Sequence, residues 1–290
     1  MKKLMTILVL ICTFAIQMNA QDIPELKRGS NKFEYHCIGA FAGITINVYY
    51  YVPARGDIKD MKVQFVMHGV NRNADDYRDS WIDKANQYSI IILAPQFDKE
   101  NFPTKKYQHG NVKNRGAINK TSAMTYSVID DIFSALVQKN QLRNTKYNLY
   151  GHSAGAQFVH RFVMFYPSPY LDMAIAANSG TYTFPQDDYD YPFGFSGIGG
   201  VSKMKEEAFN KRLTILLAEG DTIRDSNLNV TAEADLQGLN RWERGNNFFK
   251  TSKSYADKRR FPFSWQLKSM SGAAHSNSKM SKFAADLLYR

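Results

Sequence analysis

The segment Gly151-His152-Ser153-Ala154-Gly155 has residue types and a spacing that could carry out nucleophilic chemistry. An apolar run precedes this G-x-S-x-G pattern and apolar residues at helical spacing follow it, which predicts a strand, a sharp turn and a helix. Such a turn exposes the serine hydroxyl, and the glycines remove side chains that would collide with neighbouring backbone. The sequence therefore predicts Ser153 as a nucleophile, with a purely structural turn as the alternative.

A serine hydroxyl needs a base to take its proton, and the chain after Ser153 offers few candidates. His275 is the only histidine after His160, and it lies in a loop of small residues ahead of a predicted C-terminal helix. When the catalytic residues occur in the chain order serine, acid, histidine, the base lies downstream of the nucleophile, as His275 does. We predict His275 as the base, with a solvated loop histidine as the alternative.

The acid that orients the base is expected after a buried strand between the nucleophile and the base. The apolar run 213–217 leads into a turn that holds Asp221, so we predict Asp221 as this acid. Glu219 and Asp225 lie two residues before and four residues after it, and both remain alternatives. Asp221 could also be an ordinary turn residue beside Gly220.

Backbone N–H groups must stabilise the oxyanion that forms when a serine attacks a carbonyl carbon. One donor is expected from the residue after the nucleophile, Ala154, and the other from a loop after an early strand. The segment 66–71 fits the second role, with Val70 as the expected donor. His68 is interpreted as an organiser of this loop and His152 as a structural residue.

Strand-like and helix-like segments alternate along the chain, which is typical of a mostly parallel sheet with helices on both faces. No internal repeat or linker interrupts the alternation, so we expect one domain. Beside an early segment, 33–38, with strand character, the expected strands are 44–52, 62–67, 89–93, 147–150, 173–176, 213–217 and 263–267. The expected helical faces lie within 74–85, 124–137, 158–163 and 280–288.

Two stretches, 95–110 and 182–200, do not fit the alternation and are expected to be long loops. Both follow predicted strands, and in open parallel sheets ligands bind beyond the carboxyl ends of the strands. Their aromatic residues offer flat apolar surfaces for an aromatic acyl group or a sugar ring, so we predict that Phe97, Tyr107, Tyr182 and Phe193 contact substrate. The alternative is that these rings cover the core.

The order His68-Gly69, G-x-S-x-G at 151–155, Asp221 and His275 resembles the α/β-hydrolase superfamily across nearly all of residues 33–290. The segment 68–74 is similar to the corresponding segment of secreted polyhydroxybutyrate-depolymerase-like and feruloyl-esterase-like members. The resemblance implies an α/β-hydrolase fold and a serine hydrolase. The disulfide bridges common in secreted members of that group have no counterpart here.

The first twenty residues are expected to be a signal peptide, because two lysines precede a short apolar run from Leu4 to Ile16 and the less apolar residues 17–20 fit a cleavage site after Ala20. The mature catalytic domain would then comprise residues 21–290 and be secreted or periplasmic, without stable insertion in a membrane. Only Cys37 would remain as a cysteine, and we interpret it as a buried structural residue. The net charge of +10 is scattered, so we expect no nucleic-acid partner and interpret it as attraction to acidic surface material.

These features together predict an exported serine esterase that cleaves carboxylic esters, including polysaccharide-linked or polymeric esters, through an acyl-enzyme. No cofactor is expected, and no metal site, because neither H-E-x-x-H spacing nor an acidic calcium loop occurs. A serine peptidase of the same fold is one alternative. A non-catalytic carbohydrate- or polymer-binding module is the other, although binding alone would need none of the three triad residue types.

Overall fold

The structure is a computed structural model, and it describes residues 23–290. The predicted signal peptide, residues 1–20, lies outside the described residues. Within them, none of the helices is both long enough and apolar enough to span a membrane.

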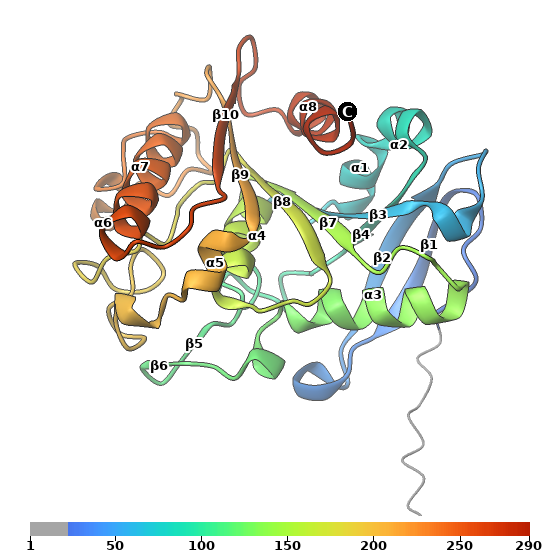
Figure 1. The fold of residues 1–290 in the computed structure, drawn as a ribbon, viewed down its shortest axis with the longest axis horizontal. Helices are drawn as coiled ribbons and strands as arrows, with labels where there is room; N and C mark the ends of the chain where they lie inside the picture. The colour runs from blue at the N-terminus through green and yellow to red at the C-terminus, as the bar shows by residue number, and fades with distance from the viewer. Residues whose placement is uncertain (1–22) are drawn as a thin grey trace, which may run out of the picture.

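A central sheet of eight strands carries the fold (Figure 1). The sheet runs in the order β1-β2-β4-β3-β7-β8-β9-β10, and the first two strand pairs are antiparallel whereas the remaining pairs are parallel. Strands β5 and β6 form a small separate hairpin. The strands are β1 (Gly29–His36), β2 (Thr45–Val52), β3 (Lys62–Met67), β4 (Ile90–Pro95), β5 (Lys113–Asn114), β6 (Ala117–Ile118), β7 (Tyr147–His152), β8 (Leu171–Ala177), β9 (Arg212–Ala218) and β10 (Gln266–Met270).

Helices cover both faces of the sheet (Figure 1). The α-helices are α1 (Ala74–Asp79), α2 (Ile82–Tyr88), α3 (Ser127–Asn140), α4 (Ala154–Phe165), α5 (Glu206–Asn210), α6 (Ala232–Asp235), α7 (Arg241–Arg259) and α8 (Asn277–Tyr289). Short 3-10 helices occur at η1 (Gly39–Phe41), η2 (Ile58–Asp60), η3 (Thr121–Ala123) and η4 (Val201–Lys203).

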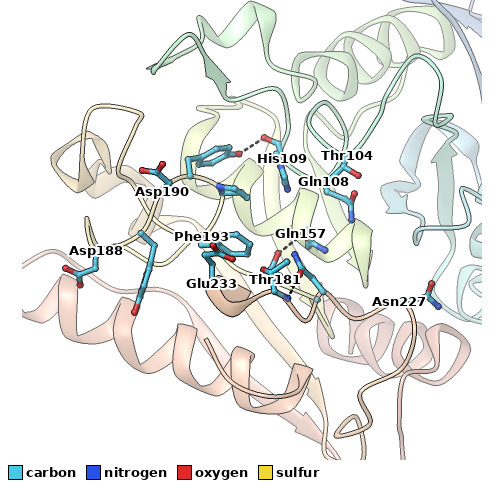
Figure 2. Close-up of a pocket in the computed structure, with 16 residues that line it drawn as sticks. Thr104, Gln108, His109, Gln157, Thr181, Asp188, Asp190, Phe193, Asn227 and Glu233 are labelled. Atoms are coloured by element: carbon cyan, nitrogen blue, oxygen red, sulfur yellow. Dashed lines mark hydrogen bonds between the residues drawn. The ribbon is translucent and has the colours of Figure 1, made fainter. Parts of the chain in front are cut away.

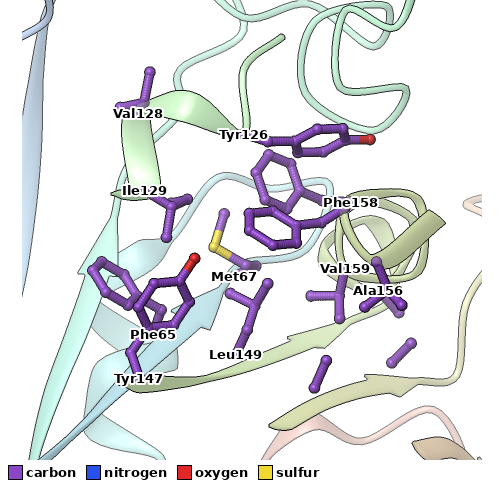
Figure 3. Packing of buried hydrophobic residues seen from close by; sticks show 14 of the residues in the cluster. Phe65, Met67, Tyr126, Val128, Ile129, Tyr147, Leu149, Ala156, Phe158 and Val159 are labelled. Atoms are coloured by element: carbon purple, nitrogen blue, oxygen red, sulfur yellow. The ribbon is translucent and has the colours of Figure 1, made fainter. Parts of the chain in front are cut away.

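Alternate residues of the strands enter two separate hydrophobic clusters, one on each face of the sheet. In β9, Ile215 and Leu217 belong to the cluster that also contains residues of α3, α4 and α7. Leu216 of the same strand belongs to the cluster that contains residues of α1, α2 and α8. Figure 3 shows the first cluster where Phe158 and Val159 of α4 lie near β7. The mostly parallel α/β fold predicted from the alternation of segments is confirmed.

Three details of the fold differ from the sequence predictions. The last strand is Gln266–Met270 rather than 263–267, because Phe263 and Trp265 pack against Phe209 and the Trp265 indole N–H donates to the Ala208 carbonyl oxygen. The helical face predicted within 74–85 is divided between α1 and α2, which meet at residues 80–81. The sequence pattern does not indicate helix α7, because few of its positions are apolar and buried.

Cys37 is buried, as predicted, and it is a free thiol within residues 23–290. Burial raises the pKa of its thiol to about 12, with a smaller contribution from the charge of Asp131. Such a thiol is almost entirely protonated near neutral pH and is a poor nucleophile.

Candidate active site

Ser153 lies at the turn between β7 and α4 in a backbone conformation that side chains rarely adopt, with φ of 58° and ψ of −115°. Its hydroxyl does not cap the helix, and the residue is partly exposed although its neighbours from Tyr147 to Met164 are buried. Positive φ at a non-glycine residue costs about 1–3 kcal/mol, so packing around the turn must hold it. The turn therefore presents the Ser153 hydroxyl in the way the G-x-S-x-G pattern predicts.

The two glycines of the motif lie where a side chain would collide with backbone. A Cβ atom at Gly151 would come within 2.3 Å of the Gly155 carbonyl oxygen, and one at Gly155 within 2.1 Å of the Met67 carbonyl oxygen. Close packing at Gly155 brings the first turn of α4 against the end of β3. These glycines therefore allow the turn at Ser153 to pack closely against the loop that follows β3.

Asp221 and His275 come together although 54 residues separate them in the sequence. The His275 Nδ1 atom lies 2.7 Å from Asp221 Oδ2, and the side chains are 24% and 2% exposed respectively. A carboxylate accepts a hydrogen bond, so Nδ1 carries the proton and Nε2 is left as the basic nitrogen. The pair has the tautomer that a general base requires.

Backbone contacts hold the two loops that carry this pair. The Gly220 N–H donates to the Ala273 carbonyl oxygen at 2.9 Å, which joins the loop after β9 to the loop before α8. Asn178, at the end of β8, donates from its side chain to the Ala274 carbonyl oxygen and accepts from the Ala218 N–H. Three neighbouring strand ends therefore position the acid and the base.

The other two candidate carboxylates have different partners. Asp225 accepts two hydrogen bonds from Arg241, at 2.7 and 3.0 Å, and this contact lowers the pKa of Asp225 to about 2. Glu219 accepts a hydrogen bond from the Ser269 hydroxyl at 2.9 Å. Among these carboxylates only Asp221 hydrogen-bonds to His275, while Arg241 also lies 3.5 Å from its second oxygen.

His152 lies at the turn that carries Ser153, and its ring packs against His275. The two imidazole rings lie 4.5 Å apart between centroids, and His152 directly precedes Ser153 in the chain. The His152 Nδ1 atom lies 3.2 Å from the Tyr77 hydroxyl. This hydroxyl also packs closely on Gly69, because a Cβ atom at Gly69 would lie only 2.6 Å from the hydroxyl oxygen. Burial holds the pKa of His152 well below its usual value, so His152 is a neutral ring against the face of His275.

The predicted oxyanion donors lie on the two segments that meet at Gly155. Ala154 is the first residue of α4, and Val70 follows the end of β3 in the loop that begins at His68. Neither backbone N–H donates a hydrogen bond within the described residues. Two free donors near Ser153 are what an oxyanion site would offer.

His68 organises the loop after β3, in agreement with its interpretation from the sequence. Its Nε2 accepts from the Phe97 N–H at 3.0 Å and its Nδ1 donates to the Gly69 carbonyl oxygen. Burial, and then the charge of Arg72, lowers the pKa of His68 to about 3. The neutral ring therefore joins the loop after β3 to the loop after β4.

The aromatic residues predicted to contact substrate are mostly part of the core, and the prediction for Phe97, Tyr107 and Tyr182 is corrected. Their side chains have no exposed surface. Phe97 and Tyr107 stack on each other with centroids 5.5 Å apart, and Tyr182 stacks on Phe248 at 4.5 Å. Phe193 differs from them because it is only partly buried and lines a cavity.

This cavity has a volume of about 670 Å³ and begins one helical turn from the candidate nucleophile. Gln157, which lines it, donates its backbone N–H to the Ser153 carbonyl oxygen. Figure 2 shows how segments distant in the sequence surround it. We call it the Gln157 cavity, and its lining residues are Thr104, Gln108, His109, Gln157, Gly180, Thr181, Asp188, Tyr189, Asp190, Tyr191, Pro192, Phe193, Asn227, Asn229, Thr231 and Glu233.

The sequence does not predict two residues of the site, Arg241 beside the acid and Gln157 in the cavity. Arg241 is the first residue of α7, and a signal for this helix does exist. Asn240 caps it by accepting from the Glu243 N–H, and Glu243 accepts in return from the Leu239 N–H. The N-x-x-E spacing is close to a capping box and could have predicted the start of α7. No comparable signal marks Gln157.

No group of three or more His, Cys, Asp or Glu side chains in residues 23–290 is arranged to hold a metal ion.

Comparisons with known proteins place this chain in a family. The structure of LpqC, a poly(3-hydroxybutyrate) depolymerase from Bordetella parapertussis, matches with a TM-score of 0.85 and 30% identity over 91% of this chain and 90% of that one. Poly(aspartic acid) hydrolase-1 from Sphingomonas sp. KT-1 matches with a TM-score of 0.83 and 33% identity over 91% of this chain and 100% of that one. The chain therefore belongs to the α/β-hydrolase superfamily of serine hydrolases.

More distant structures share the fold. An S-formylglutathione hydrolase from Staphylococcus aureus matches with a TM-score of 0.55 and 14% identity over 90% of this chain and 97% of that one. Neither the family models nor the curated proteins gave a match.

Proposed function

We propose that this chain is an exported serine hydrolase that cleaves carboxylic esters with Ser153, His275 and Asp221. The observation that carries the proposal is the 2.7 Å contact of Asp221 with His275 at a place where the ring of His275 also meets the residue before Ser153. Membership of a family of serine hydrolases supports the same conclusion.

In the first half of the reaction, Ser153 Oγ attacks the ester carbonyl carbon while His275 Nε2 takes the hydroxyl proton. Asp221 accepts the hydrogen bond from Nδ1–H of His275 and stabilises the imidazolium ion that forms. The N–H groups of Val70 and Ala154 donate to the oxyanion of the tetrahedral intermediate. Collapse of this intermediate breaks the bond to the alcohol oxygen, which receives the proton from His275 and leaves.

In the second half, water replaces the alcohol. His275 takes a proton from the water as it attacks the acyl-enzyme carbonyl carbon, and a second tetrahedral intermediate uses the same two N–H donors. Its collapse releases the carboxylic acid and returns the proton to Ser153. Ser153 is partly exposed and its hydroxyl does not cap α4, so the hydroxyl is free to react in both halves.

The substrate is proposed to be a bulky ester, either polymeric or linked to a polysaccharide. The Gln157 cavity is large enough for a group well beyond acetyl, and one of the similar structures is a poly(3-hydroxybutyrate) depolymerase. Phe193 supplies an apolar face inside this cavity. A bulky ester is therefore expected to be a better substrate than an acetate ester.

Export is proposed from the N-terminal sequence, with the enzyme acting in the periplasm or outside the cell. Cleavage after Ala20 gives a mature chain that begins at Gln21. Intact-mass analysis of protein recovered from the native host measures this end directly. Recovery of a membrane-bound chain that still begins at Met1 would contradict the proposal.

The activity is tested with p-nitrophenyl esters of graded chain length, acetylated and feruloylated sugars, and a peptide amide. Ser153→Ala, His275→Ala and the double variant should each lose kcat by about a thousandfold or more, and by similar amounts, because both residues act in one proton transfer. Near-normal ester turnover by Ser153→Ala refutes the mechanism. Cleavage of the amide in preference to the esters would indicate a peptidase, and absence of any turnover a binding module.

A further inference from the structure

The Gln157 cavity has an electrostatic character opposite to that of the whole chain. Three carboxylates line it, Asp188, Asp190 and Glu233, whereas no lysine or arginine does. The one histidine of the lining, His109, has a pKa lowered to about 3 by burial and by the charge of Arg161, so it is neutral. The chain as a whole carries a formal charge of +10. The negative lining is therefore a local feature of this cavity.

The carboxylates are available to a ligand. All three are exposed, and none forms an ion pair or hydrogen bond through its side chain within residues 23–290. Asp190 lies near a basic residue, Lys113. A Cβ atom on Gly197 would lie 3.5 Å from Asp190 Oδ1 and 2.6 Å from Lys113 Nζ, so both groups lie beside Gly197. Asp188 and Glu233 have no such neighbour among the described interactions.

The inner end of the cavity carries a hydrogen-bond donor in a fixed orientation. Gln157 is 8% exposed, and its Oε1 atom accepts from the Thr181 hydroxyl at 2.9 Å (Figure 2). The same oxygen accepts from Arg161 at 3.4 Å. Because the oxygen is occupied, the Nε2 amide donors are left without an acceptor among the described residues. Nε2 lies beside Gly180, since a Cβ atom on Gly180 would be 3.2 Å from it. A charged donor on Oε1 also polarises the amide and strengthens these N–H donors.

Arg161 fixes this arrangement from beneath the cavity. It has no exposed surface and no carboxylate partner within residues 23–290, and it donates instead to the carbonyl oxygens of Gln108, Gln157 and Pro192 and to the Thr183 hydroxyl. Its hydrogen bonds therefore reach from α4 to both loops that line the cavity. Arg161 and Gln157 both lie on α4, so the Gln157 amide is held by the helix that follows Ser153.

We propose that the Gln157 cavity selects the uncharged, hydroxyl-bearing part of an ester substrate and rejects anionic groups, with Gln157, Asp188 and Glu233 as the specificity-determining residues. A hydroxyl group can accept from Gln157 Nε2 and can donate to the carboxylates, whereas an anionic group is repelled by those carboxylates. This inference rests on the proposed function and specifies its substrate class. A polyanionic chain, such as the one named for the hydrolase from Sphingomonas sp. KT-1, is expected to be a poor ligand.

Two pairs of esters test the proposal, each with an uncharged group in one member and a carboxylate at the same position in the other. One pair carries the charge on the alcohol, methyl 3-O-acetyl-glucoside against the corresponding glucuronide; the other carries it on the acyl group, p-nitrophenyl glutaramate against p-nitrophenyl hemiglutarate. We expect the full-length mature enzyme to prefer the uncharged member of at least one pair by about fivefold or more in kcat/KM at low salt. The preference should shrink near 1 M salt, where the screening length is about 3 Å.

Variants separate the cavity from the charge of the whole chain. Asp188→Asn with Glu233→Gln should abolish the preference, whereas Asp75→Asn with Glu34→Gln, two exposed residues outside the cavity, should retain it. Gln157→Leu should raise KM for the preferred uncharged ester more than it lowers kcat. Equal kcat/KM within both pairs, or a preference that survives in the cavity variant, overturns the proposal. Loss of all turnover by Ser153→Ala in the same assays shows that the proposed mechanism stands in either case.

Discussion

Replacement of Asp221 by asparagine should change the tautomer of His275. In the native protein Asp221 accepts from His275 on one side and faces Arg241 at 3.5 Å on the other. An asparagine has one oxygen, and this oxygen will face Arg241, because an amide nitrogen there would set two donors against each other. The NH₂ group then faces His275 Nδ1, which must become an acceptor. The proton moves to Nε2, the atom that should take the proton of Ser153.

The expected loss in kcat is about a thousandfold to ten-thousandfold, which corresponds to about 4–5.5 kcal/mol of transition-state stabilisation. Steady-state hydrolysis of a p-nitrophenyl ester measures it, and ¹⁵N NMR of the histidine side chain reports the tautomer. Asp225→Asn is the matched control. It should cost less than about tenfold, since Asp225 contacts Arg241 and not His275. A His275 that keeps its Nδ1 proton in Asp221→Asn, or a larger loss in the control, would refute this reasoning.

Tyr77→Phe should lower kcat by about tenfold with little change in KM, because it removes the hydroxyl between the loop at Gly69 and the ring beside His275; steady-state kinetics that show only a KM effect would contradict this. Phe193→Ala should raise KM for bulky esters with little change in melting temperature, while Tyr107→Ala should cost about 3–5 kcal/mol of stability; equal melting temperatures would be the contrary result. The free energy of unfolding should fall as the pH drops from about 6.5 toward 3, because His68 and His109 stay neutral in the folded protein but gain a proton in the unfolded chain. Each of the two residues should contribute about 1.4 kcal/mol per pH unit to this decrease. Urea titrations across this range measure the slope, and a flat profile would argue against neutral rings for these two histidines in the folded protein.

The sequence predicts those parts of the site that local chain geometry determines. The strand-turn-helix context of Ser153 depends on a few neighbouring residues, and the structure has that turn with its glycines in close contact. The pairing of Asp221 with His275 could be predicted only from chain order, as both follow strands of one parallel sheet. Arg241 could not, because its contact with Asp225 depends on how α7 packs.

The burial of the aromatic residues in the two long loops could not be predicted from the sequence. The aromatic residues of the loops 95–110 and 182–200 are predicted to contact substrate, yet Phe97 and Tyr182 are fully buried. Their burial depends on partners distant in the chain: Phe158 of α4 for Phe97 and Phe248 of α7 for Tyr182. Only Phe193, whose ring is partly free, retains the predicted position at a cavity. Composition alone does not distinguish these cases.

The buried guanidinium of Arg161 constrains any redesign of this enzyme. Loops taken from a relative to change specificity would have to present carbonyl oxygens at the positions of Gln108 and Pro192, or leave a buried charge without acceptors. An incompatible loop would then reduce folding yield before it altered substrate choice. Exchange of both loops together with α4, as one unit, is expected to give more folded protein than exchange of either loop alone.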